Sequence, residues 1–105
     1  MLDLYILQGH EPVRVDDMDV WARSLAAMDR RVAYDEVGPL RVSTVFLGID
    51  HRWGDEGPPL VFETMIFGED ALHPWASTYC MRGSTWTEAL MMHARALASA
   101  RKLIN

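Results

Sequence analysis

The chain has 105 residues, of which 50% are hydrophobic, and its 15 acidic and 10 basic residues give a net charge of −5. This length predicts a single domain, residues 1–105, with enough apolar residues for one core. The acidic balance argues against nucleic acid or an anionic membrane as the partner, because both are polyanionic. The single cysteine and the lack of a leader or a long apolar run predict a cytoplasmic protein.

The first third of the chain is predicted to form a strand, an extended stretch and a helix. Residues 2–8 alternate like a short strand, residues 9–12 break it, and residues 13–15 run extended. Asp16 or Asp17 can begin a helix, because an acidic side chain at the N-cap accepts free backbone N–H groups. The apolar residues that recur at helical spacing, and so predict its buried stripe, are Met18, Trp21, Leu25, Met28 and Val32.

The middle of the chain predicts three strands joined by two turns. Residues 32–37 form a short strand, which Gly38 and Pro39 turn into the next one. Residues 40–50 and 60–67 are rich in Val, Phe, Ile and Thr and flank a polar connection, which is typical of a β-hairpin.

The register of this hairpin decides which side chains share a face. We place Asp50 opposite Leu60, so that Gly48 lies opposite Phe62. One face then carries apolar side chains beside one carboxylate: Val45, Leu47, Ile49, Val61, Glu63 and Met65. The other face carries mainly apolar and hydroxyl side chains: Thr44, Phe46, Gly48, Asp50, Leu60, Phe62, Thr64 and Ile66. Because both faces are largely apolar, a helix, a long loop or another subunit is expected to cover the second one.

The last third of the chain predicts a strand over residues 75–82 and then a long helix. Thr85 and Glu88 match a capping box, in which each side chain accepts a hydrogen bond from the other residue's backbone N–H. The helical stripe is Trp86, Leu90, His93, Leu97, Ala100 and Ile104. The order β-α-β-β-β-β-α predicts an α+β domain with two helices and an antiparallel sheet of four to five strands.

The connection between the hairpin strands is the first candidate binding site. It gathers charged and aromatic side chains on a loop: Asp50, His51, Arg52, Trp53, Asp55 and Glu56. Binding residues are often found on loops that a rigid scaffold positions. Trp53 at an exposed tip would be a binding anchor, since Trp and Arg are enriched among interface hot spots. The alternative is that Trp53 folds back onto the sheet and the acidic side chains are merely solvated.

Patterns for catalysis or cofactor binding are weak. The histidines and carboxylates lie at no recognised ligand spacing, so neither a metal nor a cofactor is expected. Glu63 is interpreted as a structural acid paired with an arginine such as Arg41, or with Trp and Tyr donors. His93 is interpreted as a hydrogen-bonded core histidine, and Cys80 as an ordinary packed thiol. An enzyme or ligand-binding domain built on Glu63, His51 and His93 is the alternative.

Three segments resemble a family of small uncharacterised proteins encoded by bacteriophages and prophages. They are V-S-T-V-F-L-G-I-D-H-R-W-G-D-E-G-P-P-L-V-F-E-T-M-I-F-G at 42–68, S-T-W-T-E-A-L-M-M-H at 84–93, and W-A-R-S-L-A-A-M-D-R-R-V-A at 21–33. The resemblance brings no activity with it. It implies a cytoplasmic protein in a bacterial host, with a phage or host macromolecule as its target.

Together these features predict a non-enzymatic protein that acts by contact with a protein partner, as a homodimer. Two narrower alternatives stay open: an inhibitor of a bacterial defence system, and a virion or assembly component.

Overall fold

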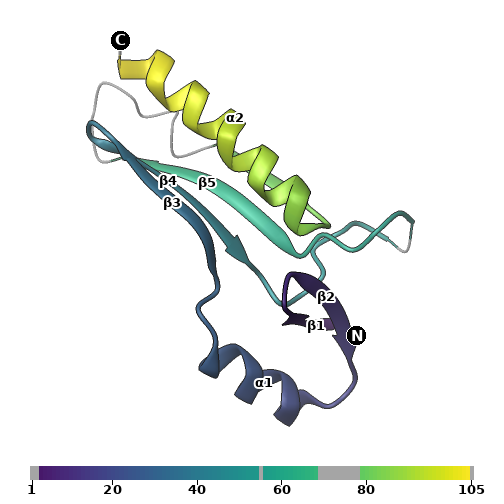
Figure 1. Ribbon diagram of the computed structural model, residues 1–105. Helices are drawn as coiled ribbons and strands as arrows, with labels where there is room; N and C mark the ends of the chain where they lie inside the picture. The colour runs from purple at the N-terminus through teal and green to yellow at the C-terminus, as the bar shows by residue number, and fades with distance from the viewer. Residues whose placement is uncertain (1–2, 55, 69–78, 105) are drawn as a thin grey trace.

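The computed structural model describes residues 3–54, 56–68 and 79–104, and its elements form two antiparallel sheets and two helices (Figure 1). In chain order they are β1 (Leu4–Gln8), β2 (Glu11–Val15), α1 (Met18–Ala27), β3 (Arg31–Val37), β4 (Leu40–Phe46), β5 (Phe62–Gly68), β6 (Cys80–Gly83) and α2 (Trp86–Ile104). The α+β class and the element order are confirmed. β2 is an additional strand, at a place where the sequence predicts only an extended stretch. β1 and β2 pair with each other, while the larger sheet has the order β3-β4-β5-β6. Residues 75–78 of the predicted last strand lie outside the described residues.

The central hairpin pairs β4 with β5 in a register that differs from the predicted one by two residues. Phe46 lies opposite Phe62, where the prediction placed Gly48. A shift of two residues keeps every side chain on its face, because side chains alternate with a period of two. Within β4 and β5 the predicted division into two faces is therefore right, although the predicted partners are wrong. Residues 47–50, 60 and 61 lie outside these strands, and Val61 is buried with Phe46 and Phe62.

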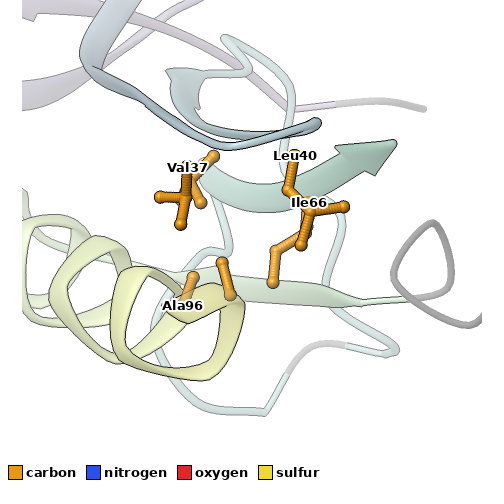
Figure 2. Packing of buried hydrophobic residues seen from close by; sticks show 6 residues of the cluster. Val37, Leu40, Ile66 and Ala96 are labelled. Atoms are coloured by element: carbon orange, nitrogen blue, oxygen red, sulfur yellow. The ribbon is translucent and has the colours of Figure 1, made fainter. Parts of the chain in front are cut away.

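α2 lies along one face of the larger sheet and encloses the core (Figure 1). Figure 2 shows Ala96 of α2 against Val37, Leu40 and Ile66, which come from β3, β4 and β5. All four are buried. Burying one such Leu or Ile side chain stabilises the fold by roughly 1.5–3 kcal/mol.

The buried side of α2 is rotated from the stripe that the sequence predicts. The residues facing the sheet are mostly small: Ala89, Met92, His93, Ala96 and Ala100. Leu90 is 47% exposed and Ile104 is 37% exposed. Alanines allow the helix backbone to approach the sheet closely, so the larger apolar residues lie at the side of the contact instead of at its centre.

The N-terminus of α2 has the predicted capping box. The Thr85 hydroxyl accepts a hydrogen bond from the Glu88 N–H at 3.0 Å, and the Glu88 carboxylate accepts one from the Thr85 N–H at 3.1 Å. The reciprocal pair satisfies backbone donors that an α-helix leaves free at its start.

α1 begins as predicted but ends earlier. Its N-cap Asp17 accepts hydrogen bonds from the N–H groups of Asp19 and Val20, whereas Met28 is already extended and Val32 lies in β3. The Asp29 side chain accepts a bond from the Arg31 N–H at 3.0 Å, which favours a turn over a further helical turn. None of the helix's residues is fully buried.

The face of the larger sheet opposite α2 has no described helix over it, since α1 packs on β1 and β2. Ser43, Val45, Glu63 and Met65 lie on this open face and are half-buried. The expected cover by a helix is therefore absent from the described residues. Cover by a loop or by another subunit stays a prediction.

Neither α1 nor α2 combines the length and the apolar character needed to cross a membrane.

Gly48 is the point where the chain leaves β4 and meets β1 and α1. Its carbonyl accepts hydrogen bonds from the Tyr5 N–H at 2.8 Å and from Trp21 Nε1 at 2.9 Å. Its φ of 77° is in the left-handed region, where a side chain is strained. A Cβ at this position would lie 2.7 Å from a methyl carbon of Leu25.

Replacing Gly48 by alanine is expected to destabilise the fold by about 2–4 kcal/mol, because backbone strain and a steric clash add. Gly54→Ala is the matched control, since Gly54 has a φ of 72° but an added Cβ there would meet nothing within 4 Å. It should cost only about 1 kcal/mol. Urea unfolding measures both, and equal losses would contradict the close packing of Leu25 on Gly48.

Candidate functional site

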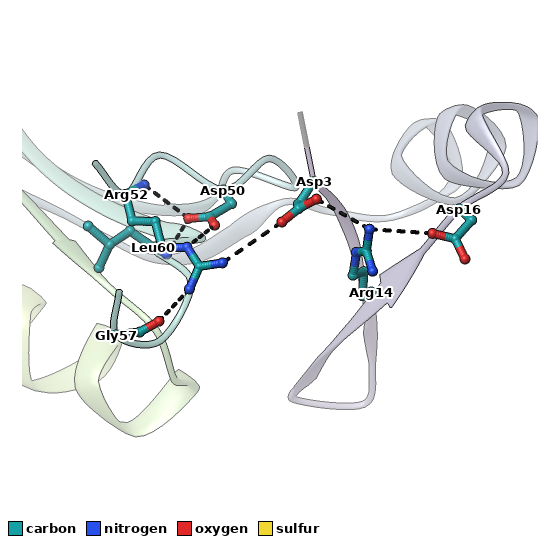
Figure 3. A network of polar contacts seen from close by, with 7 residues as sticks. All are labelled: Asp3, Arg14, Asp16, Asp50, Arg52, Gly57 and Leu60. Carbon is teal, nitrogen blue, oxygen red and sulfur yellow. Dashed lines mark hydrogen bonds and ion pairs between the residues drawn. The ribbon is translucent and has the colours of Figure 1, made fainter. Parts of the chain in front are cut away.

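The connection between β4 and β5 is organised by the Asp50 carboxylate (Figure 3). Its Oδ1 accepts hydrogen bonds from the N–H groups of Arg52 and Leu60, both at 2.9 Å. Its Oδ2 lies 2.7 Å from Arg52 Nε, and the Asp50 side chain is only 6% exposed. The carboxylate thus joins the beginning of the loop to its end.

The Arg52 guanidinium extends this network along the loop and toward β1. It donates to the carbonyl of Gly57 and lies 3.9 Å from Asp3 Oδ2 (Figure 3). Asp3 also contacts Arg14 of β2 at 3.4 Å. The ion pair of Arg14 with Asp3 is exposed and contributes little to the stability of the fold. The ion pair of Arg52 with Asp50 is mostly shielded from solvent.

Trp53 follows directly and is 98% exposed. The interpretation in which its ring folds back onto the sheet is therefore wrong. His51 and Glu56 are also exposed, and Asp55 lies outside the described residues. The five predicted residues that the structure describes thus divide by position: Asp50 and Arg52 form the base of the loop, and His51, Trp53 and Glu56 are presented to solvent.

A groove of about 590 Å³ lies beside this loop, between the β1–β2 hairpin and the start of α2. Pro59 of the loop lines it together with Tyr5, His10 and Trp86. The His10 and Trp86 rings are stacked, with their centroids 3.8 Å apart and their planes within 3°. Sequence reasoning missed this groove, because no local pattern connects a turn near the N-terminus to a helix near the C-terminus.

His93 belongs to a chain of hydrogen bonds in the core. Its Nδ1 lies 2.8 Å from Thr44 Oγ1, and its Nε2 lies 2.8 Å from Asp35 Oδ2. Thr44 Oγ1 is 2.6 Å from Thr64 Oγ1. The order acid, imidazole, hydroxyl is that of a nucleophilic triad, but both threonines are 0% exposed, so no substrate can reach them in this structure. The interpretation of His93 as a hydrogen-bonded core histidine is confirmed.

Glu63 lies on the opposite face of the sheet from His93. It pairs with Arg82 at 3.0 Å, where the sequence interpretation proposed Arg41 as an example. The exposed loop residue His51 does not join them, so the alternative site of Glu63, His51 and His93 is not assembled.

Cys80 is exposed, so the interpretation of its side chain as an ordinary packed thiol is wrong. Its thiol lies 3.6 Å from the Glu63 carboxylate. Partial desolvation of the thiol raises the pKa of Cys80, and the negative charge of Glu63 raises it further. The reactive thiolate form is therefore disfavoured at neutral pH. Within the described ranges, His, Cys, Asp and Glu side chains form no group of three that could hold a metal ion.

Asp50→Ala is expected to destabilise the protein by about 2–3 kcal/mol, because two backbone N–H groups and Arg52 lose a charged acceptor. Hydrogen exchange at the amides of Arg52 and Leu60 should accelerate together. The exposed loop residue Glu56 gives the control, since Glu56→Ala should change the stability by no more than about 0.5 kcal/mol. Retention of slow exchange in Asp50→Ala would contradict the role of this carboxylate.

Thr44→Val should cost about 1–3 kcal/mol, because it leaves a ring nitrogen of the buried His93 without its hydroxyl partner. Thr64→Val keeps the bond between Thr44 and His93 and should cost about 1 kcal/mol or less. Thermal unfolding of the two isosteric variants compares them. A larger loss for Thr64→Val would contradict the order of the chain.

Comparison with models of protein families, with curated proteins and with solved structures finds no match to this chain. The resemblance to bacteriophage and prophage proteins therefore stays a prediction.

Proposed function

We propose that this protein is a non-enzymatic binding module that acts by contact with a protein partner, and that Trp53 is the anchor of the contact. The observation that carries the proposal is a 98% exposed tryptophan on a loop whose base is held by Asp50, an aspartate with a side chain only 6% exposed. A loop ordered before binding loses less conformational entropy when the complex forms. A large aromatic ring presented by such a loop is a typical hot spot.

The neighbouring groove supports the same surface. Pro59 belongs both to the connection and to the lining of the groove, so the groove begins at the end of the loop that carries Trp53. A partner large enough to cover both the loop and the groove can contact the Trp53 ring and also place a side chain of its own against Tyr5 or Trp86. A concave region beside a projecting aromatic ring gives a contact both shape and orientation.

The charge of the region favours a basic partner. Glu11 lines the groove, Glu56 is exposed on the loop, and the net charge of the chain is −5. Complementary charge speeds association and disfavours acidic partners. The resemblance to phage and prophage proteins suggests a phage or host macromolecule, and a nucleic-acid-binding protein of a defence system has the required basic surface. A role in the virion or in its assembly is the alternative for the same surface.

Trp53→Ala should abolish capture of the partner by the immobilised protein from a bacterial lysate, and should weaken the purified complex by at least about 30-fold, or roughly 2 kcal/mol. Met18→Ala is the matched control, because Met18 is 67% exposed and lies on α1. It should capture the same protein as the wild type. The proposal would be contradicted if the wild type, Trp53→Ala and Met18→Ala all captured the same proteins, or if none of them captured any protein.

A further inference from the structure

β3 forms an edge of the four-stranded sheet (Figure 1). It has seven residues and pairs with β4 on its inner side only. In an antiparallel ladder, alternate residues direct their N–H and C=O groups to one side and then to the other. An edge strand therefore offers a row of backbone donors and acceptors to another strand. In the part of the chain that the structure describes, no strand pairs with this outer side.

The side chains of β3 are arranged so that the strand is complementary to itself. Arg31 and Glu36 lie on the same face, opposite Val45 and Arg41 of β4. A bulge between Arg31 and Ala33 brings Arg31 onto this face, although five positions separate it from Glu36.

Tyr34 lies midway between the two charges. Its partner on β4 is Ser43, which is two residues from each of Val45 and Arg41, the partners of the charged residues. The Arg31 guanidinium carbon is 4.3 Å from the centroid of the Tyr34 ring. The Tyr34 hydroxyl donates to Glu36 Oε1 at 3.1 Å. The three side chains are therefore already ordered in a single row.

We propose that a second copy of this chain pairs antiparallel along β3, with the two-fold axis at Tyr34. Antiparallel pairing of a strand with itself reverses the order of its residues. Arg31 of each copy then lies opposite Glu36 of the other, on both sides of the axis. Opposite charges at facing positions stabilise a strand pair, and like charges destabilise it. The four-stranded sheets of the two copies then form one sheet of eight strands.

α2 supplies a second observation on the same side of the molecule. His93 reaches Asp35 of β3, whereas Met92 lies at Gly83 of β6, where a Cβ would come within 2.8 Å of its sulfur. The flank of the helix beyond His93 therefore faces the β3 edge. Leu90, three residues before His93, and Ile104 lie on this flank.

This flank explains why the apolar stripe of α2 is wider than the sheet it covers. Leu90 is 47% exposed and Ile104 is 37% exposed, although both belong to the helical repeat of apolar residues. Strands added at β3 extend the sheet under this flank. The apolar row and the unpaired strand edge thus indicate the same occupant, a second copy of the chain.

The proposal takes up the homodimer that the sequence predicts, and it does not depend on the partner of Trp53. The connection between β4 and β5 extends away from β3 in Figure 1. Each surface can therefore be altered separately.

Sedimentation equilibrium of purified protein tests the charge order. The wild type should have twice the 11.9 kDa mass of one chain. Arg31→Glu and Glu36→Arg should each weaken the dimer at least about tenfold, because symmetry places two like-charge pairs in each dimer. The double variant should regain the dimer, since its reversed charges again face their opposites. Failure of the double variant to recover, with a native circular dichroism spectrum, would overturn the proposal.

A cross-link tests the position of the axis. Tyr34→Cys in a Cys80→Ser background should form a disulfide-linked dimer under mild oxidation, because facing residues of a hydrogen-bonded pair have Cα atoms about 5.5 Å apart. Met18→Cys in the same background should stay uncross-linked. A wild type that is monomeric at micromolar concentration would overturn the dimer. If that monomer still captured a partner through Trp53, the binding function would stand without it.

Discussion

The pairing of β4 with β5 under α2 is the interaction on which the rest of the structure depends. Thr44 and Thr64 face each other across the two strands and are hydrogen-bonded at 2.6 Å. His93 continues this contact from the helix to Asp35 of β3. One chain of hydrogen bonds therefore connects three strands with α2 in an apolar core, where polar groups must find partners. Every buried side-chain polar atom of the described residues has such a partner.

The two surfaces proposed for binding, the loop that carries Trp53 and the edge of β3, are positioned by the pairing of β4 with β5. Because β4 ends at Phe46 and β5 begins at Phe62, the two ends of the connection lie where a single carboxylate, that of Asp50, can bond to both. Trp53 is thereby presented on a fixed base. The order of the sheet also places β3 at an edge, with an apolar flank of α2 beside it. The interior thus determines which groups are available to partners.

The sequence predicts the features that depend on residues close together along the chain. The capping pair of Thr85 and Glu88 lies within three positions, and the faces of the hairpin follow from a period of two. The register could not be predicted, because nothing near Gly48 indicates that its carbonyl bonds to β1 and α1 instead of continuing β4. The stack of His10 on Trp86 joins distant segments, and the structural role of Asp50 depends on both ends of a loop that only the fold brings together.

Native-state hydrogen exchange tests the central role of this pairing most directly. The account predicts that amides of β4, β5 and α2 exchange only by global unfolding, with the same free energy of opening and the same dependence on denaturant. Amides of α1, none of whose residues is buried, should exchange by a smaller opening of lower free energy. Protection in α1 equal to that in β4, or an opening of α2 that leaves β4 and β5 protected, would contradict the account.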